Sequence, residues 1–381
     1  MEHVESAPPL AHLPAARAAA SAISACLRAP GTQLDNVEFA NAVDTLAMKL
    51  ADLDVNSGDV VAVLLPNRVE VVVTLFAAWY RGAALTPINP AQTDDEIDYQ
   101  LKDSAASVIV GDARAADLAA GLGITYIDVE SMLAVPVATN VRTAPILAQS
   151  DDHALIIYTS GTTGRPKGCV LDHANVNAMV SSVIAHCEFT AEDRSLLILP
   201  LFHMNGLLLG TLAALQAGGS VYIEPRFDPT TFWDTVAEYR PTYFSAVPTM
   251  FTLLNAESRE PVDASSIRFA ISGASPLAPA LLRTFEDRFG FRVVEGYGLA
   301  ETTVAVTINP VCGRRKVGTV GPPLPGQAIS IVSPLGDPLP DGSVGEVVVF
   351  GPNVMRGYLG RPDDTAKVLR DRWLHTGDLG Y

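Results

Sequence analysis

Apolar residues in the first third of the chain follow two alternating periods. Between residues 39 and 53 they recur every three or four positions, as on one face of a helix, whereas residues 60–65 are apolar without interruption, as in a buried strand. Thr93 followed by Glu96 has the spacing of a capping box, which predicts a helix start. Helices are expected at 39–53, 67–80 and from 93, alternating with strands at 60–65, 84–88 and 107–110. This alternation predicts βαβ units and a mostly parallel sheet.

The same alternation resumes after residue 150. Residues 132–150 lack periodicity and carry two prolines, so we interpret them as a connector, and we interpret residues 1–30 as a loose start followed by a short helix. Helices are expected at 174–186, 206–216, 229–239 and 248–255, strands at 154–157, 195–199, 220–223 and 243–246, and segments 263–271, 279–289 and 292–297 continue the pattern. A second α/β unit follows from this pattern.

After residue 310 the pattern changes again. Glycine and proline become frequent, helical periodicity disappears, and short β-rich runs at 328–332 and 346–350 alternate with turns. We therefore predict an α/β protein with a first α/β unit over residues 31–150, a second over 151–310 and a small β lobe over 311–381.

Composition and charge restrict the classes of function. Of the 381 residues 48% are hydrophobic, enough for a large folded core, and the formal net charge is −16. Such a charge repels nucleic acid and anionic membranes, so a small-molecule role fits better. The four cysteines lack metal-binding spacing, and we see neither an export signal nor an apolar run of the ~20 residues that span a bilayer. We expect a cytoplasmic protein without an integral membrane segment.

A glycine-rich stretch, residues 158–168 (YTSGTTGRPKG), follows the predicted strand at 154–157. Its glycines let backbone N–H groups approach an anion closely, and its hydroxyls and lysine add donors and positive charge. The residues concerned are Thr159, Ser160, Gly161, Thr162, Thr163, Gly164, Lys167 and Gly168. A Walker A loop is excluded because Lys167 is followed by glycine instead of Ser or Thr. The alternative is a flexible surface linker, but the preceding buried strand and the Pro-Lys-Gly end favour a phosphate-binding loop.

A single histidine stands between a predicted strand and a predicted helix. His203 lies in residues 199–206 (LPLFHMNG), at the kind of strand end where α/β sheets bind ligands. A lone histidine among apolar residues is more often a core residue, so this position alone does not make His203 functional.

Two turns contain small residues where a flat ring could bind. Residues 271–277 (ISGASPL) follow a predicted strand and leave room for such a ring. Residues 295–302 (EGYGLAET) set Tyr297 between two glycines and carry Glu301 near their end. Tyrosine can stack on a purine, and a carboxylate is a ligand that Mg²⁺ prefers. A plain glycine-rich surface turn would not explain both side chains.

Together these stretches resemble, in order and spacing, the motifs of the adenylate-forming superfamily, which includes acyl-CoA and aryl-CoA synthetases, peptide-synthetase adenylation domains and luciferases. The motifs are residues 158–168, 199–206, 271–277, 295–302 and 375–378 (HTGD). The resemblance implies the large N-terminal domain of these enzymes, with two α/β sheet subdomains in a layered αβαβα arrangement and a small β-barrel-like lobe. Because the family has its hinge near residue 381, we expect the small C-terminal domain, which carries the lysine for adenylation, to be absent.

The resemblance also implies roles for individual residues. Nucleotide-binding residues would be Thr159, Ser160, Gly161, Thr162, Thr163, Gly164, Lys167, Gly273, Ala274, Ser275, Glu295, Gly296, Tyr297, Gly298, Thr302 and Asp378. The acyl group would lie against His203, Met204, Val247, Gly273 and Gly298. Mg²⁺ would be held by Thr159 and Glu301, and the catalytic residues would be His203, Glu301 and Lys167.

The implied activity is ATP- and Mg²⁺-dependent activation of a carboxylic acid to acyl-AMP, followed by thioester formation with coenzyme A. The acid is expected to be fatty or otherwise apolar. An amino acid is disfavoured, since amino-acid activators usually have an aspartate where His203 stands. Two alternatives remain open: transfer to the phosphopantetheine arm of a carrier protein, and a non-catalytic module that binds a nucleotide or acyl-adenylate. Without a C-terminal domain, the chain is expected to be largely inactive as a ligase.

Overall fold

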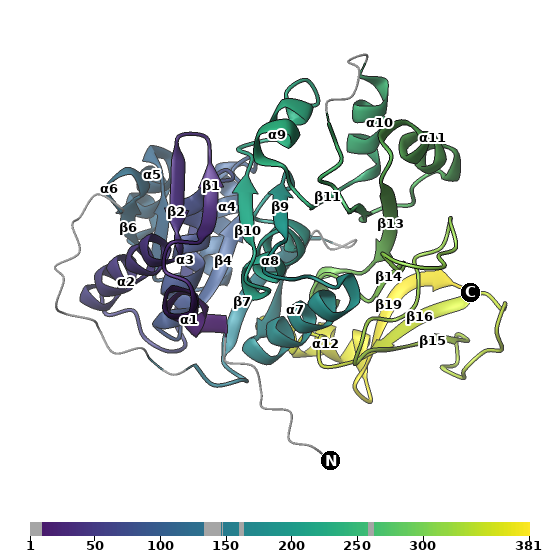
Figure 1. Ribbon diagram of the computed structural model, residues 1–381. Coiled ribbons are helices and arrows are strands. Elements are labelled where there is room, and N and C mark those ends of the chain that lie inside the picture. The colour runs from purple at the N-terminus through teal and green to yellow at the C-terminus, as the bar shows by residue number, and fades with distance from the viewer. Residues whose placement is uncertain (1–9, 133–145, 147, 160–163, 258–262) are drawn as a thin grey trace.

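The computed structural model of the chain describes residues 10–132, 146, 148–159, 164–257 and 263–381. Three sheets and the helices that cover them make up this part of the chain (Figure 1). None of its helices is long and apolar enough to cross a membrane.

One sheet has seven strands in the order β17-β8-β7-β4-β3-β5-β6. They are β3 (Val60–Leu64), β4 (Ala84–Ile88), β5 (Val108–Gly111), β6 (Thr125–Asp128), β7 (His153–Thr159), β8 (Lys167–Asp172) and β17 (Gly357–Tyr358). Strands β3 to β7 pair in parallel, and β8 turns back antiparallel to β7. Every residue of β3 and β4 is buried, as expected for strands covered on both faces.

A second sheet has eight strands in the order β14-β13-β12-β11-β9-β10-β1-β2. They are β1 (Ala25–Ala29), β2 (Thr32–Asp35), β9 (Arg194–Leu197), β10 (Ser220–Ile223), β11 (Tyr243–Ala246), β12 (Phe269–Ser272), β13 (Arg292–Tyr297) and β14 (Thr307–Ile308). Its inner strands pair in parallel, and the two outer pairs, β1–β2 and β13–β14, are antiparallel.

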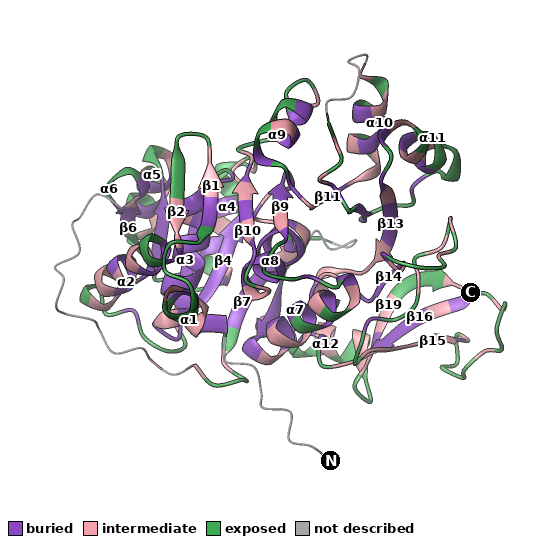
Figure 2. Ribbon diagram, in the orientation of Figure 1, coloured by how far each residue is buried: buried purple, intermediate pink, exposed green. Residues whose placement is uncertain are grey.

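Helices fill the space between the two sheets and cover their outer faces. The middle layer contains α2 (Asn36–Asp52), α3 (Val69–Tyr80), α7 (His173–Cys187), the π-helix η2 (Asn205–Leu212) and α8 (Ala213–Gln216), whose side chains share one core with both sheets. The outer layers are α4 (Asp94–Asp103) and α5 (Ala113–Leu122) on the seven-stranded sheet, and α9 (Phe232–Tyr239), α10 (Pro248–Ala256) and α11 (Pro279–Phe289) on the eight-stranded sheet. Figure 2 shows burial along the strands and the inward helix faces. The predicted αβαβα layering is confirmed.

The predicted β lobe is a four-stranded antiparallel sheet in the order β15-β16-β19-β18. Its strands are β15 (Ala328–Val332), β16 (Gly345–Phe350), β18 (Leu369–Arg370) and β19 (Trp373–Gly380). The expectation of no helix after residue 310 was wrong, because α12 (Pro362–Val368) lies between β17 and β18. Proline at its first position and two aspartates in its first turn favour a helix start at this point.

The N-terminal segment contains more structure than expected. The predicted short helix is present as α1 (Leu13–Ala20), preceded by the 3₁₀ turn η1 (Leu10–His12), but β1 and β2 follow it as a hairpin. Leu27 of β1 lies opposite Val221 of β10, so the hairpin is held by a strand that is distant in sequence (Figure 1). A two-stranded hairpin is marginal by itself, which explains why its local sequence gives little signal.

Sheet membership does not follow the predicted boundary at residue 150. The hairpin β1–β2 belongs to the eight-stranded sheet, although most of that sheet comes from later in the chain, and β7–β8 belongs to the seven-stranded sheet. The expected helix at 206–216 is also different, because its first part is the π-helix η2. Two remaining short helices are α6 (Val129–Met132) and the 3₁₀ helix η3 (Ala300–Thr302).

Candidate active site

The carboxyl ends of strands from both large sheets meet around a cleft of about 600 Å³. Open α/β sheets bind ligands at such strand ends. One wall comes from the end of β7, another from the segment that follows β9, and a third from the segment that follows β13. Six of the predicted site residues line this cleft: Thr159, His203, Met204, Val247, Ala274 and Gly298.

The glycine-rich loop joins β7 to β8, and the structure describes its two ends. Thr159, the last residue of β7, pairs with Lys167, the first residue of β8. Gly164 has a φ of +152°, and a Cβ on Gly168 would lie 3.0 Å from the Ile156 side chain. Both positions therefore favour glycine. Ser160, Gly161, Thr162 and Thr163 lie outside the described residues, so their nucleotide contacts stay predictions.

Lys167 is held by an acidic side chain of α12. Its Nζ lies 2.9 Å from Asp364 Oδ2 and 5.1 Å from the centre of the Tyr358 ring, and the Lys167 side chain is 23% exposed. Asp364 also pairs with Lys367 at 2.8 Å. The two lysines, Lys367 first, lower the pKa of Asp364 to about 2. In this arrangement an incoming phosphate and Asp364 would compete for the same lysine.

Glu301 lies on η3 and accepts a hydrogen bond from Tyr358. The Tyr358 hydroxyl is 2.8 Å from Glu301 Oε1, and burial followed by the Glu301 charge raises the pKa of Tyr358. The neighbouring Thr302 is fully buried. Its hydroxyl donates to the Leu299 carbonyl at 3.0 Å and accepts from the Leu299 N–H at 3.1 Å. Thr302 therefore shapes the turn that presents Glu301.

A magnesium ion at this place would need ligands from the nucleotide as well as from the protein. The described residues contain no group of three or more His, Cys, Asp and Glu side chains with metal-binding geometry. A carboxylate has several acceptor positions, and the described contacts of Glu301 use one of them. Mg²⁺ is commonly held by one or two carboxylates together with substrate phosphates. Glu301 fits that chemistry, and Thr159 could add a hydroxyl.

The end of β13 forms the turn predicted to hold adenine. The Tyr297 hydroxyl donates to Asp378 of β19 at 2.7 Å, so these two predicted nucleotide residues lie side by side. A Cβ on Gly298 would lie 2.3 Å from the Val304 carbonyl oxygen, and one on Gly296 2.9 Å from that of Thr307. No other residue type fits either position without a backbone shift. The turn is therefore made of closely packed backbone.

Four more predicted nucleotide residues surround this turn. Glu295 accepts a hydrogen bond from the Gly318 N–H at 3.0 Å, and burial raises the pKa of its carboxyl group. Gly273 is buried at the end of β12. Ala274 has a φ of +70°, in the left-handed region, and Ser275 is exposed. The side chains at 273–275 are small, and binding of a flat ring beside them stays a prediction.

His203 stands at the mouth of the cleft. Its ring lies 4.6 Å from the Phe202 ring, and its backbone N–H donates to the Pro200 carbonyl at 3.1 Å. The ring is accessible, but the cleft walls remove part of its hydration, and this desolvation lowers the pKa of His203. The ring is therefore predominantly neutral near pH 7. His203 is therefore not a core residue, which was the alternative interpretation of its position in the sequence.

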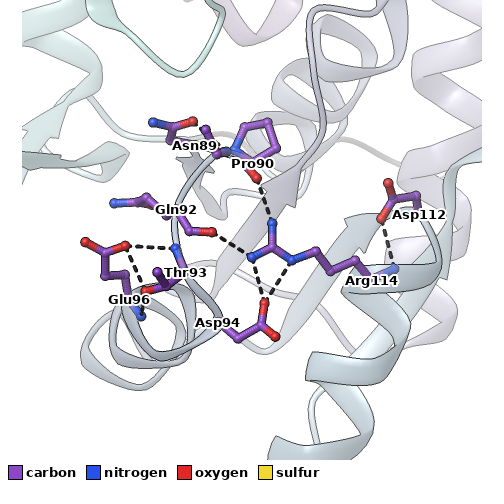
Figure 3. Close-up of polar contacts among 9 residues, drawn as sticks. Asn89, Pro90, Gln92, Thr93, Asp94, Glu96, Asp112 and Arg114 are labelled. Atoms are coloured by element: carbon purple, nitrogen blue, oxygen red, sulfur yellow. Dashed lines mark hydrogen bonds and ion pairs between the residues drawn. The ribbon is translucent and has the colours of Figure 1, made fainter.

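One wall of the cleft is fixed by an arginine that does not itself line it. Arg114 donates to the carbonyls of Pro90 and Gln92, both at 2.6 Å, and pairs with Asp94 (Figure 3). Thr93 and Glu96 form the predicted capping box at the start of α4. Asn89, Gln92 and Glu96 line the cleft, so Arg114 and the capping box position a polar part of its wall.

Sequence patterns missed three side chains of the site. Asp364 contacts Lys167, and Tyr358 contacts Glu301. In each pair the two residues are distant in sequence, and no local sequence pattern predicts such contacts. Asn205 lies inside the 199–206 stretch, but the sequence did not predict a role for it, although its side chain lines the cleft. The only available signal was its polar type among apolar neighbours.

Residues 14–359 match the family described as AMP-binding enzyme. The chain belongs to this family. As an AMP-binding enzyme it is similar to a feruloyl-CoA synthase of Amycolatopsis sp, with 36% identity over 372 residues, 96% of this chain and 74% of that protein. It is also similar to an oxalate–CoA ligase of Arabidopsis thaliana, with 35% identity over 368 residues, 91% of this chain and 71% of that protein.

Solved structures support the same family. The structure of ATP-bound MatB from Rhodopseudomonas palustris matches with a TM-score of 0.89 and 32% identity, and the match covers 97% of this chain and 76% of that one. These relatives confirm the predicted superfamily and the fold. The relatives at the sequence level are CoA ligases, so this AMP-binding enzyme is related to enzymes that join acids to coenzyme A.

Proposed function

We propose that this chain binds ATP and a carboxylic acid in the cleft and joins them into acyl-AMP, the first half of an acid–CoA ligase reaction. The observation that carries the proposal is that the end of the glycine-rich loop at Thr159, the ring of His203 and the turn at Gly298 line one cavity. Its volume of about 600 Å³ lies in the range of small-molecule sites. The CoA-ligase relatives support the same class of reaction.

In this proposal the nucleotide is bound at the edge of the cleft. Tyr297 takes the adenine, Asp378 the ribose hydroxyls, and the glycine-rich loop with Lys167 the phosphates. Backbone N–H groups and a lysine stabilise the negative charge that develops on the departing pyrophosphate. Mg²⁺, held by Glu301 and Thr159, would supply further positive charge at the phosphates.

The acid lies beside His203 and Met204. Its carboxylate attacks the α-phosphorus in line, and the acyl–phosphate bond forms as the bond to pyrophosphate breaks. No protein nucleophile is required, because binding both substrates in one cleft supplies proximity and orientation. The neutral ring of His203 can form a hydrogen bond to the carboxylate without trapping it as an ion pair. In the second step the thiol of coenzyme A displaces AMP and forms the thioester.

The acid predicted from the sequence is fatty or otherwise apolar. Met204 and Val247 support an apolar wall, since Met204 is only 6% exposed and both line the cleft. Because the overall charge of −16 repels ATP, ATP would be attracted by the local positive potential at Lys167 and the loop amides.

The test is a single-turnover experiment with the chain in excess over ATP, so that slow chemistry becomes visible. ATP, Mg²⁺ and a panel of carboxylic acids are added, and acyl-AMP and pyrophosphate are measured by mass spectrometry. We expect acyl-AMP that depends on the acid. Release of ADP, or nucleotide products independent of any acid, would contradict the proposal. Transfer only to a phosphopantetheine carrier protein would identify a different acceptor.

A further inference from the structure

A small recess opens off the cleft beside the adenine turn. It has a volume of about 40 Å³ and lies between the ends of β12 and β13 and the start of η2. Four residues line both the recess and the cleft: Asn205, Ala274, Gly298 and Val304. The recess is therefore where a substrate that reaches in from the cleft would place its far end.

The walls of this recess leave little freedom to enlarge it. Gly296 and Gly298 pack against the carbonyl oxygens of Thr307 and Val304 so closely that a Cβ on either glycine would collide. Leu209 and Ile271, both buried, also line the recess. A water molecule needs at least about 10–15 Å³ in this measure of volume, so the recess accommodates about three or four non-hydrogen atoms. A long chain or an aromatic ring does not fit.

One side chain gives the recess a polar group. Oδ1 of Asn205 is shielded from water and has no hydrogen-bond partner among the described residues. Nδ2 of the same amide lies 3.5 Å from the place where a Cβ on Gly273 would be, and Gly273 also lines the recess. A buried amide without a partner costs free energy, and a ligand that supplies the partner recovers it. The hydroxyl of Tyr297, which also lines the recess, is already bonded to Asp378.

The lining also restricts the charge of the ligand. Apart from Asn205 and Tyr297, the described residues around the recess are apolar or glycine, and none of them carries a charge. A second carboxylate in such a place would be desolvated without a counter-ion. A hydroxyl group fits better, because it both donates and accepts and so complements either orientation of the asparagine amide.

We propose that the acid activated in this cleft is a short hydroxy acid, with about three or four non-hydrogen atoms beyond its carboxyl group and a hydroxyl that bonds to Asn205. The proposal rests on the proposed function, whose substrate class it narrows. It differs from the fatty or otherwise apolar acid expected from the sequence, because the far end of a long chain does not fit the recess. Asn205 is then a specificity-determining residue.

The experiment uses hydrolysis-resistant analogues of acyl-AMP in which a sulfamoyl group replaces the phosphate. All carry the same adenosine and differ in the acyl group: butanoyl, 3-hydroxybutanoyl, succinyl and decanoyl. Binding to the chain is measured by calorimetry. We expect the hydroxybutanoyl analogue to bind about tenfold more tightly than the butanoyl analogue, the effect of one hydrogen bond to a buried amide. The succinyl and decanoyl analogues should bind at least about tenfold more weakly than the butanoyl analogue.

The variant Asn205→Leu should abolish the preference for the hydroxyl group, so that the hydroxybutanoyl and butanoyl analogues bind to it with equal affinity. The matched control is Asn177→Leu on α7, since Oδ1 of Asn177 is also shielded and has no partner among the described residues, but Asn177 lines neither cavity. This control should keep the preference. Equal affinity for hydroxybutanoyl and butanoyl analogues in the unmodified chain, or tightest binding of the decanoyl analogue, would overturn the inference and leave the proposed function standing. Failure of every analogue to bind would refute the proposed function and this inference with it.

Discussion

His173 is expected to make the protein sensitive to mild acid. Its side chain is 2% exposed, its ring packs edge-on against Trp79 at 5.2 Å, and neither ring nitrogen has a hydrogen-bond partner among the described residues. Burial lowers the pKa of His173 from 6.5 to about 4, although Asp152 and Asp172 act in the opposite direction. Protonation in the folded state is therefore unfavourable.

The sign and size of the effect follow from the two pKa values. Above pH 6.5 the ring is neutral in the folded and the unfolded chain, so it adds no pH dependence. As the pH falls from 6.5 towards 4, the unfolded chain binds the proton and the folded chain does not, so the free energy of unfolding decreases. The gap between pKa 6.5 and about 4 corresponds to about 3 kcal/mol in total, of which about 2 kcal/mol is lost by pH 5.

The assay is urea denaturation at pH 7, 6 and 5, followed by circular dichroism. His173→Phe keeps a ring against Trp79 and removes the titration, so its stability should fall by about 2 kcal/mol less than that of the unmodified chain between pH 7 and 5. The control is His153→Gln, at an exposed histidine on β7. The comparison uses the pH dependence, so a constant packing loss in His173→Phe does not affect it. Equal pH dependence in the unmodified chain and in His173→Phe would refute the reasoning.

Two further predictions concern the phosphate end of the cleft. Glu301→Gln keeps the size of the side chain and its contact with Tyr358 but removes a charged ligand. The Mg²⁺ concentration that gives half-maximal acyl-AMP formation should therefore rise about tenfold, with unfolding by urea unchanged. Identical Mg²⁺ titrations of the variant and the unmodified chain would contradict the metal role. Lys167→Ala should weaken ATP binding about tenfold in calorimetry, as expected for the loss of a charge-assisted hydrogen bond, whereas Asp364→Asn should strengthen it, because Asp364 competes for that lysine. Lys367→Ala is the matched control, as it removes the other partner of Asp364. A weaker affinity of Asp364→Asn for ATP would show that the Lys167–Asp364 ion pair positions Lys167 instead of restraining it.

Much of the fold could be predicted from the sequence, because its elements are long and strongly periodic. The strands at 220–223 and 243–246 have the predicted bounds, and the capping box at Thr93 starts α4. Pairing between distant segments could not be predicted. The hairpin β1–β2 pairs with β10, and β7–β8 belongs to the seven-stranded sheet through the pairing of β7 with β4. Local periodicity does not predict either pairing.

The residues of the candidate site also divide into those that the sequence predicted and those that it could not predict. Residues that belong to compact motifs, such as Thr159, His203 and Gly298, line one cleft as the motif order suggested. The partners that restrain these motifs, Asp364 on Lys167 and Tyr358 on Glu301, come from the segment around α12 and carry no local signal. The size of the recess beside the adenine turn depends on how closely β13 packs against the segment at Val304, which only three-dimensional packing reveals.

The central claim, that this cleft binds an acyl-adenylate, is tested most directly by calorimetric titration of the chain with an acyl-sulfamoyl adenosine in the presence and absence of ATP. The account predicts one binding site per chain, an affinity at least about tenfold above that of AMP, since acyl and nucleotide contacts add, and competition by ATP. It also predicts weaker binding in Asp378→Asn, which removes the charge proposed to hold the ribose. No binding of the analogue, or binding that ATP does not displace, would contradict the account.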